Sequence, residues 1–325
     1  MIGHKKILIT GAGGYIGSRL SEFLSFQGHE IIGIFHSLPA NKNKWTSLVS
    51  EIVIGDIRNE KIINLITRHE PQIIIHLVSL DQNESEKNYN KTFITNVQPI
   101  WNILNESIKK NNKLEKFINF SSVQVYGKIN SGVIDENQKV KPINNYGLTH
   151  YLREEICNYY NNSSNIRCMN LRLSNSYGNP VFTDTKCWNL VINDLAKTAY
   201  EQKKIVLNSN GNSFRDFIHY SDICHTIDKL IKNNKTPQSN TINLCTSKSV
   251  SLLSLAKLIQ DVYLIRYRVK IPIFINKNEL YDEEKEKINS NFKISNKVLR
   301  KYIHTPVKSL KEGVNDIFEY FEKNN

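Results

Sequence analysis

The fold of this chain is decided by the stretch Lys-Ile-Leu-Ile-Thr-Gly-Ala-Gly-Gly-Tyr-Ile-Gly, residues 6–17. It begins with the apolar residues of a buried strand and leads into a helix predicted over residues 15–27. Gly11, Gly14 and Gly17 lie at the junction, where a dinucleotide-binding loop needs a tight turn, a close backbone approach to pyrophosphate and a close helix–strand contact. The start of the helix adds N–H groups and a positive dipole end. The stretch therefore predicts a dinucleotide site.

Downstream of this loop, short apolar runs continue to alternate with helix-like stretches, a pattern typical of a parallel sheet covered by helices. From about Ser176 strands become fewer, and residues 276–289 are rich in Lys, Asn and Glu, as in a solvated surface segment. We expect an α/β protein, with a Rossmann-type doubly wound parallel sheet in residues 1–175 and a smaller substrate-binding lobe in residues 176–325, with some interleaving. The expected strands are residues 6–10, 30–35, 52–54, 73–77, 116–120 and 165–173, and the expected helices are 15–27, 60–68, 93–110, 146–160, 188–200 and 252–263.

The composition, 40% hydrophobic and 23% charged, is that of an ordinary soluble globular protein. No apolar run approaches the ~20 residues of a membrane-spanning helix. The apolar run at residues 7–9 is too short for a signal peptide, so we expect a cytoplasmic protein with no membrane partner. The net charge of +12 is spread along the chain without a basic stripe, and we expect no nucleic-acid partner. Five scattered cysteines without CxxC pairs argue against a disulfide framework and against a metal site.

Two later stretches carry the residues of a proton-transfer pair. Ser122 follows the predicted strand at 116–120, and Tyr146 begins a predicted helix. Beside a nicotinamide, a phenolate can take the proton of a hydroxyl as hydride leaves the same carbon, while the serine orients the oxygen. A phenol with a pKa near ~10 must be acidified to act at neutral pH, which requires a cation one helical turn away.

With these stretches in order, the chain resembles the extended short-chain dehydrogenases that act on nucleotide sugars, the group of UDP-galactose 4-epimerase and dTDP-glucose 4,6-dehydratase. The resemblance covers almost the whole chain and implies hydride transfer at a sugar carbon, usually C4. It implies a 4-epimerase or a 4-dehydrogenase/ketoreductase of surface-polysaccharide sugar biosynthesis. The motifs that carry it are the glycine loop, residues 76–79, Asn96, Ser122, Tyr146, residues 172–178 and residues 215–219.

The chain departs from the family pattern at two places. Four residues after Tyr146 the family has lysine, and this chain has His150 on the same helix face. His150 is the third expected catalytic residue, because an imidazole can donate to a ribose hydroxyl and, if protonated, can lower the pKa of the tyrosine. Its unperturbed pKa of ~6.5 gives it only a partial charge near neutrality, so activity would be slower, need higher pH or depend on a cationic nicotinamide. The alternative is a lost active site, and with it a non-catalytic cofactor sensor. Val123 and Gln124 stand where the 4,6-dehydratases have an acid and a base, which disfavours dehydration.

The resemblance also implies a set of cofactor contacts. The end of the second strand, where an acid would select NAD, holds Phe35-His36-Ser37. NAD(H) and NADP(H) therefore both stay open, with NAD favoured by the resemblance alone. Asp56 is placed either to bind an adenine amino group or to cap the following helix. The expected cofactor-binding residues are Gly11, Gly14, Tyr15, Ile16, Gly17, His36, Asp56, Ile57, Leu77, Asn96, Tyr146 and His150.

On the substrate side, the resemblance implies a nucleotide-diphosphate sugar held by Gln124, Asn175, Asn189 and Arg215. Arg215 offers paired donors to a diphosphate, and the alternative is a surface ion pair with Asp216. Asn175 and Asn189 can equally cap turns or helices, and Asn189 is expected to open one. The base of the nucleotide is not readable.

The helices expected at residues 93–110 and 146–160 correspond to those that pair across a dimer interface in the family. The resemblance thus implies a homodimer, although amphipathic periodicity alone also suits packing within one chain.

Overall fold

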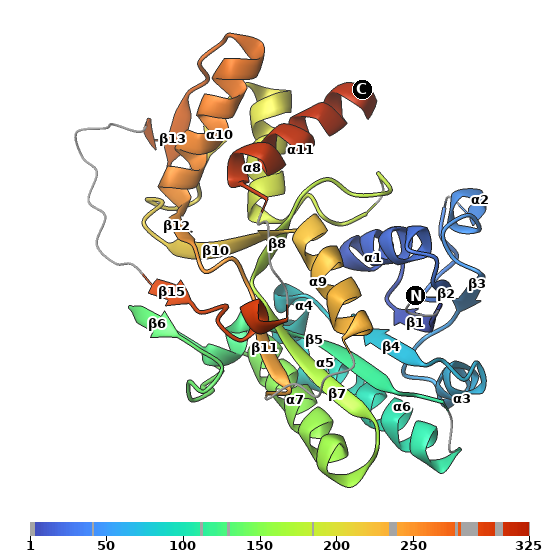
Figure 1. Ribbon diagram of the computed structural model, residues 1–325. Coiled ribbons are helices and arrows are strands. Elements are labelled where there is room, and N and C mark those ends of the chain that lie inside the picture. Colours follow the sequence, from blue (N-terminus) through green and yellow to red (C-terminus); the bar gives the residue numbers. More distant parts are fainter. Residues whose placement is uncertain are drawn as a thin grey trace.

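The computed structural model describes residues 4–40, 42–110, 113–128, 131–183, 185–233, 239–276, 279–280, 292–302 and 308–324 (Figure 1). Its centre is a seven-stranded sheet in the order β11-β7-β5-β4-β1-β2-β3, in which every neighbouring pair is parallel. The order reverses beside β1, the switch point at which doubly wound sheets bind ligands. The strands are β1 Lys6–Thr10, β2 Glu30–Phe35, β3 Glu51–Ile54, β4 Ile73–His76, β5 Lys116–Ser122, β7 Arg167–Leu173 and β11 Thr241–Leu244.

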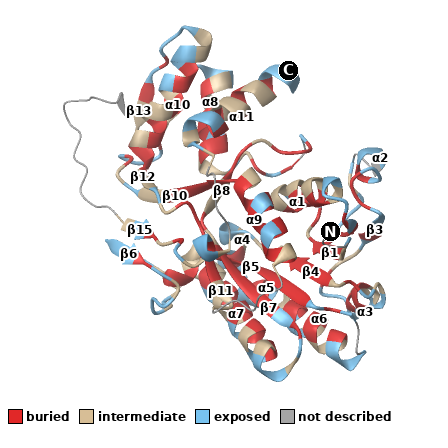
Figure 2. Ribbon diagram, in the orientation of Figure 1, coloured by how far each residue is buried: buried red, intermediate tan, exposed pale blue. Residues whose placement is uncertain are grey.

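Helices cover both faces of this sheet, because alternate residues of each strand point to opposite sides. Ile7 and Ile9 of β1 pack with α1 (Tyr15–Phe26) and α9 (Tyr220–Lys232). Leu8, between them, packs on the other side; the helices there are α3 Glu60–Arg68, α6 Gln98–Lys109 and α7 Asn145–Ser163. Apart from the edge strand β3, the strands are largely buried on both faces, as Figure 2 shows, which confirms the Rossmann-type fold expected from the sequence.

The rest of the chain after β7 forms mainly the smaller lobe, drawn at the top of Figure 1. Its own apolar core lies among three helices and includes Ala196, Ala256 and Phe318. The helices are α8 Val191–Gln202, α10 Leu252–Tyr267 and α11 Leu310–Asn324; the short strands are β8 Asn175–Tyr177, β9 Ile205–Val206, β10 Phe214–His219, β12 Ser249–Ser251, β13 Ile273–Ile275 and β14 Glu279–Leu280. The short strands form two three-stranded sheets, β12-β10-β8 and β14-β13-β9, and a parallel pair, β6 (Gly132–Ile134) with β15 (Phe292–Ile294), forms a separate two-stranded sheet.

Two helices differ from the sequence-based expectation. The helix expected at 93–110 is two helices, α5 (Tyr89–Asn96) and α6, because Pro99 in the first turn of α6 has no N–H to continue a helix from α5. The helix expected from 188 begins at Val191, and Leu190 precedes it as the N-cap residue, so Asn189 does not open it.

The division at residues 175 and 176 stays a prediction, and β11 and α9 are segments beyond it that join the Rossmann sheet and its helices. Of the surface segment expected at 276–289, all but residues 276, 279 and 280 lies outside the described residues. All five cysteines are buried free thiols. None of the helices in the described ranges combines the length and apolar composition that crossing a membrane requires.

Candidate active site

The glycine loop connects β1 to α1 at the switch point of the sheet. Gly11 has a φ of +73°, and its N–H donates to the Ile34 carbonyl of β2 (3.1 Å). A Cβ on Gly17 would stand 2.1 Å from the Gly11 oxygen, so any side chain there would force the helix away from the loop. The turn and the helix contact predicted from the glycine spacing are therefore both present.

This loop fits the pyrophosphate of a dinucleotide. α1 starts after Gly14 without a side-chain cap, so no side chain occupies the anion-binding end of the helix. A pocket of about 430 Å³ opens there, lined by Gly11, Gly13, Gly14, residues 35–40, Trp45, Phe182 and Thr185. Tyr15 and Ile16 face elsewhere: the Tyr15 hydroxyl donates to the Gly178 carbonyl (2.8 Å), and Ile16 packs on the core.

The end of β2 carries aromatic packing instead of an acid. Phe35 is buried edge-on against Trp45, whose ring stacks on Phe182 at 4.6 Å between centroids. The Phe35 ring also lies 3.1 Å from the place of a Cβ on Gly13. His36 projects outward with 80% of its side chain exposed. Phe35 thus offers no acceptor to a ribose hydroxyl.

Asp56 follows β3 and is held by Arg58. Its carboxylate accepts the Arg58 backbone N–H (2.9 Å) and pairs with the guanidinium, which lowers the pKa of Asp56 to about 2. The cap of α3 is Asn59, not Asp56, so the capping alternative for Asp56 is wrong. Ile57 beside it is buried in the core.

Ser122 and Tyr146 come together at the carboxyl end of β5. Ser122 is the last residue of the strand, and its hydroxyl lies close enough to the Tyr146 phenol to lower the pKa of that tyrosine. Asn144 caps α7 by accepting the Gly147 N–H (2.7 Å), which fixes the start of the helix that carries Tyr146. The Gln124 side chain joins this cap, since its oxygen accepts from Asn144 (3.0 Å) and its amide donates to Gln82 (3.1 Å).

His150 lies one turn further along α7, with its ring 4.4 Å from that of Tyr146 between centroids. It is buried, and its Nε2 is 3.4 Å from the Ser79 hydroxyl. Burial and the charge of Arg153 hold the pKa of His150 well below its usual value, although the nearby Phe120 carbonyl acts in the opposite direction. The imidazole is therefore neutral at neutral pH.

Arg153 is a residue of this site that the motif comparison missed. Its side chain is 0% exposed; Nε donates to Asn119 Oδ1 (3.0 Å) and Nη1 to the Val78 carbonyl (3.4 Å). Burial lowers the pKa of Arg153 to about 10, which leaves it charged at neutral pH. The periodicity of α7 could have found it, because Arg153 follows Tyr146 by seven residues on one helix face.

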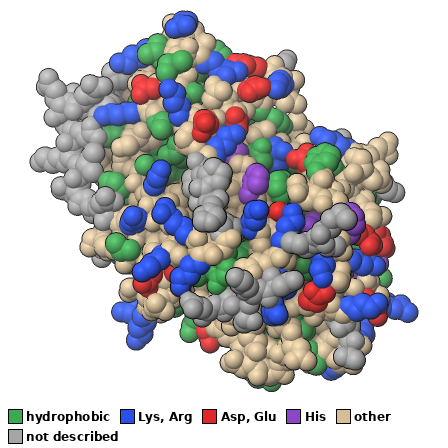
Figure 3. Space-filling view, viewed as in Figure 1, with side chains coloured by type: hydrophobic (Ala, Val, Ile, Leu, Met, Phe, Trp, Pro, Cys, Tyr) green, Lys and Arg blue, Asp and Glu red, His purple; other side chains and the backbone are tan. Residues whose placement is uncertain are grey.

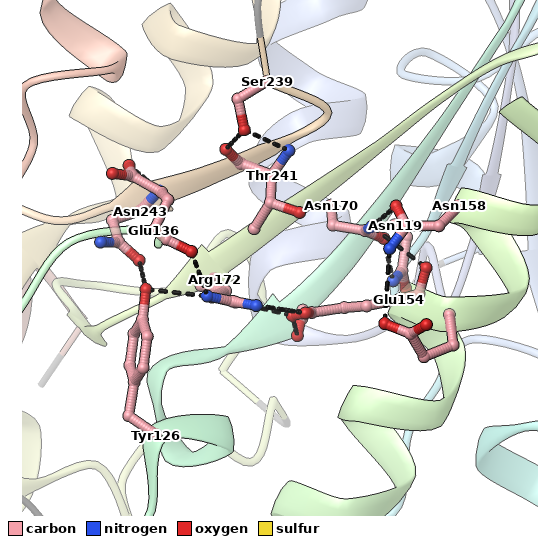
Figure 4. Close-up of polar contacts among 12 residues, drawn as sticks. Asn119, Tyr126, Glu136, Glu154, Asn158, Asn170, Arg172, Ser239, Thr241 and Asn243 are labelled. Atoms are coloured by element: carbon pink, nitrogen blue, oxygen red, sulfur yellow. Dashed lines mark hydrogen bonds and ion pairs between the residues drawn. The ribbon is translucent and has the colours of Figure 1, made fainter. Parts of the chain in front are cut away.

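Glu154, the next residue, points into a polar network around Arg172 (Figure 4). Its carboxylate receives Nε and Nη2 of Arg172 from β7, the latter at 2.7 Å, and the hydroxyl of Ser121. Arg172 also donates to the Tyr126 hydroxyl (2.9 Å), which in turn donates to Asn243 of β11 (2.7 Å). The network ties α7 to β5, β7 and β11 and so fixes the helix of the active site.

Asn96 and Leu77 hold the loop after β4 in place. Asn96 is fully buried; its Oδ1 accepts the Leu80 N–H (2.8 Å), and its amide donates to Thr149 of α7 (3.0 Å). The Leu77 N–H donates to the Thr10 carbonyl (3.3 Å). The Asn96 side chain thus links the loop after β4 to α7.

The substrate-side residues lie on β8, on β10 and before α8. Arg215 is half-buried and forms no ion pair with a described residue, whereas Asp216 is buried and accepts from Ser174 and Thr246 (both 2.9 Å). The ion-pair alternative for Arg215 is therefore wrong. The Asn175 amide donates to the Asp216 carbonyl (2.9 Å), and Asn189 is exposed.

The basic side chains do not gather into one stripe on the face drawn in Figure 3, where Lys and Arg stand at several places with Asp and Glu among them. Among the described residues, no group of three or more His, Cys, Asp and Glu side chains could hold a metal ion.

Comparison with known proteins gives a consistent result. A family model described as the NAD dependent epimerase/dehydratase family matches residues 7–245. The UDP-glucose 4-epimerase of Mycoplasma genitalium is 27% identical over 81% of this chain and 83% of its own length. The GDP-6-deoxy-D-talose 4-dehydrogenase of Aggregatibacter actinomycetemcomitans is 24% identical over 94% of this chain and 96% of its own.

A solved structure supports the fold. The UDP-glucuronic acid 4-epimerase of Bacillus cereus, in complex with UDP-glucuronic acid and NAD, superposes with a TM-score of 0.79 at 23% identity. The match covers 98% of this chain and 100% of that one.

Proposed function

This chain belongs to the NAD-dependent epimerase/dehydratase family, and from that premise we propose that it oxidises or reduces one carbon of a nucleotide-diphosphate sugar. The carbon is C4, and the enzyme is a 4-epimerase or a 4-dehydrogenase/ketoreductase of surface-polysaccharide sugar biosynthesis. The cofactor is NAD, as the family description and the Bacillus cereus complex indicate.

The observation that carries the proposal is that the Ser122 hydroxyl and the Tyr146 phenol come together at the carboxyl end of β5. A bound nicotinamide would supply the hydride acceptor or donor. Tyr146, as phenolate, would take the proton of the sugar hydroxyl during oxidation and return it during reduction, and Ser122 would hold the sugar oxygen beside the phenol. His150, buried and neutral, would hydrogen-bond the cofactor.

The substrate diphosphate would be held by the smaller lobe. Arg215 supports this assignment because its guanidinium is half-buried without a carboxylate partner among the described residues. Its paired donors match two phosphate oxygens. Asn175 and Asn189 would contact the sugar diphosphate, and Gln124 would stand at the sugar. Because Val123 and Gln124 supply neither an acid nor a base, 4,6-dehydration is not part of the proposal.

The test is a panel of UDP-, GDP-, CDP- and dTDP-sugars, incubated with the pure protein and NAD(H) or NADP(H). Absorbance in the reduced-nicotinamide band follows net redox turnover, and chromatography of the sugars follows isomerisation. A net absorbance change identifies a dehydrogenase or reductase, and an isomerised product without one identifies an epimerase. If no sugar of the panel gave an absorbance change or an isomerised product, the proposal would be contradicted and a cofactor sensor would be favoured.

We also propose that the protein is a homodimer. Large apolar side chains are exposed on α5, α6 and α7, and the rings of Trp101 and Tyr159 stack at 6.2 Å between centroids. An exposed cluster of this kind is typical of an interaction surface. Light scattering after gel filtration should give twice the chain mass, and Trp101→Glu should give the monomer. A monomeric wild-type protein would refute the dimer. The exposed residues are Tyr89, Phe93, Trp101, Ile108, Leu148 and Tyr159.

A further inference from the structure

The proposed chemistry needs a positive charge near Tyr146 that His150 does not provide. The phenolate form of a buried tyrosine is costly without a nearby cation. His150 is buried and neutral, and so is His76 at the end of β4, whose pKa burial and Arg153 hold well below the usual value. Apart from an oxidised nicotinamide, which would carry its own positive charge when bound, the cation must therefore come from another side chain.

Arg153 is placed to provide it. It lies on the face of α7 that carries Tyr146 and His150, two turns after the tyrosine. Its guanidinium contacts Asn119 of β5 and the carbonyl of Val78, the residue that follows Leu77 beyond β4. Val78 in turn lies against the glycine loop, since its N and Cγ2 are 3.5 and 3.4 Å from the place of a Cβ on Gly11. The charge thus lies at the strand ends where the dinucleotide site and the tyrosine meet.

The charge of Arg153 is not neutralised by a carboxylate. Within the described residues Arg153 forms no ion pair, and its buried Nη2 has no hydrogen-bond partner. The adjacent carboxylate, Glu154, is turned to Arg172. A buried charge with only neutral partners is costly to the fold, and its field in a dry site reaches neighbouring groups with little screening.

From this placement we propose that the buried guanidinium of Arg153 is the positive charge that stabilises the Tyr146 phenolate, and that Arg153 is a positioning residue acting through Tyr146. This inference rests on the proposed function of Tyr146 as the proton-transfer group. In the family pattern a cation one turn after the tyrosine, at position 150, supplies this charge. Here the charge is assigned to Arg153, which lies two turns after the tyrosine.

The other charged and titratable groups around Tyr146 do not replace Arg153. Burial raises the pKa of Tyr146, and the charge of Arg153 is the largest effect that opposes this, followed by the nearby Ser122 hydroxyl. Asp81, before α4 (Gln82–Lys87), raises the pKa of Tyr146 further. Glu86 of α4 accepts the backbone N–H of Tyr146 (3.3 Å) and is also an anion. With His76 and His150 neutral, Arg153 is the cation in this set.

The experiment measures the titration of Tyr146 in the full-length protein labelled with fluorotyrosine, by ¹⁹F NMR with and without NAD. The resonance absent from Tyr146→Phe identifies the residue among the 15 tyrosines. Arg153→Gln should raise the pKa of Tyr146 by about one unit or more, whereas Arg153→Lys, which keeps the charge, should leave it within about half a unit. Arg266→Gln, in the smaller lobe, removes an equal charge far from the site and should leave the pKa of Tyr146 unchanged.

The activity should follow the same order. The acidic limb of the pH profile for sugar oxidation should move to higher pH in Arg153→Gln and return in Arg153→Lys, with kcat affected more than KM. A folded Arg153→Gln protein whose Tyr146 titrates as in the wild type would overturn the proposal.

A measurement on the wild-type protein decides the matter even where Arg153→Gln fails to fold. The ¹³C resonances of the histidines, with His150 identified by its loss in His150→Gln, report the charge of the imidazole. A His150 that is neutral at pH 7 supports the proposal, and a His150 that is protonated there overturns it, because the imidazolium would then be the cation. These titrations require no turnover, so they stand apart from the sugar panel that tests the proposed function.

Discussion

Two neighbouring residues of α7 lead into two different kinds of polar interior. Glu154 enters a network in which the buried charge of Arg172 meets a carboxylate with two donors and further bonds to Tyr126 (Figure 4). Arg153 enters the space beside Tyr146, where its charge meets an amide oxygen and a carbonyl. Both arginines are buried, but only Arg172 is neutralised by a carboxylate.

The difference separates structural charge from functional charge. A buried pair with complete hydrogen bonding fixes elements relative to one another and leaves little field outside itself. A buried charge without a counterion acts on whatever group can become negative nearby, and here that group is the Tyr146 phenol. The paired region holds α7 in position, and under the proposal the unpaired charge acts on the reaction.

The largest expected effect is a loss of turnover when Tyr146, the group beside the unpaired charge of Arg153, is changed. Tyr146→Phe removes the phenolic oxygen and should lower turnover by about 10²–10⁴-fold, the usual contribution of a general acid–base group. NAD affinity, measured by calorimetry, should change little because the glycine loop is untouched. Ser122→Ala, which keeps the phenol, should retain more activity than Tyr146→Phe and serves as the control. Turnover unchanged in Tyr146→Phe would contradict the assignment of the site.

The next effect concerns stability and distinguishes the two arginines. Glu154→Gln leaves Arg172 as a buried charge without a counterion and should lower the free energy of unfolding by about 3–5 kcal/mol. Arg153→Gln removes a charge that has no counterion to lose, and should cost less than half as much. Urea denaturation followed by circular dichroism measures both. Equal losses would show that the two regions do not differ as argued.

Much of this arrangement could be predicted from the sequence. The apolar strands and the glycine spacing of residues 6–17 determine the Rossmann sheet and the loop, because both depend on local pattern. The order of Ser122 and Tyr146 predicts a proton-transfer pair in the same way, since the carboxyl ends of parallel strands meet at one edge. The structure confirms the fold class and brings these two side chains together.

What the sequence could not show depends on contacts distant in the chain. The neutrality of His150 follows from its burial and from Arg153, and the pattern around residue 150 contains neither fact. Asp216 follows Arg215 directly, yet alternate residues of a strand point to opposite faces, so the adjacent charges do not pair. The family motif covers only the tyrosine and the residue four places later. It therefore does not distinguish Arg153 from the other polar residues of α7.

A smaller effect concerns pH. Burial holds the pKa values of His76, His150 and His219 below the usual value, that of His219 at about 3. As pH falls below about 6.5, the unfolded chain binds protons that the folded one does not, so stability present above that pH is lost. Each histidine contributes a loss of about 1.4 kcal/mol per pH unit until its folded pKa is reached. Urea unfolding between about pH 7 and about pH 5.5 measures how the free energy of unfolding changes with pH. His219→Gln should reduce this slope by the contribution of up to one proton bound on unfolding.

The same slope sharpens the comparison of the two arginines. Arg153 contributes to the low pKa of His76 and of His150, so Arg153→Gln should let these imidazoles bind protons at higher pH and flatten the slope. His219 lies elsewhere and is held down by burial, Lys308 and Arg19, so its share should remain. A slope identical in Arg153→Gln and wild type would mean that the charge does not reach the two histidines.

The smallest expected effect comes from an arginine whose charge is paired at the surface. Arg58 and Asp56 form a close pair, but about a third of each side chain is exposed, so water screens the pair and solvates each group after the other is removed. Arg58→Gln should therefore change the free energy of unfolding by less than about 1 kcal/mol, and added salt should reduce even that. Denaturation at low and high salt measures it. A loss as large as that of Glu154→Gln would show that pairing alone, irrespective of burial, decides the contribution of these charges, and the distinction drawn between Arg153 and Arg172 would then need another basis.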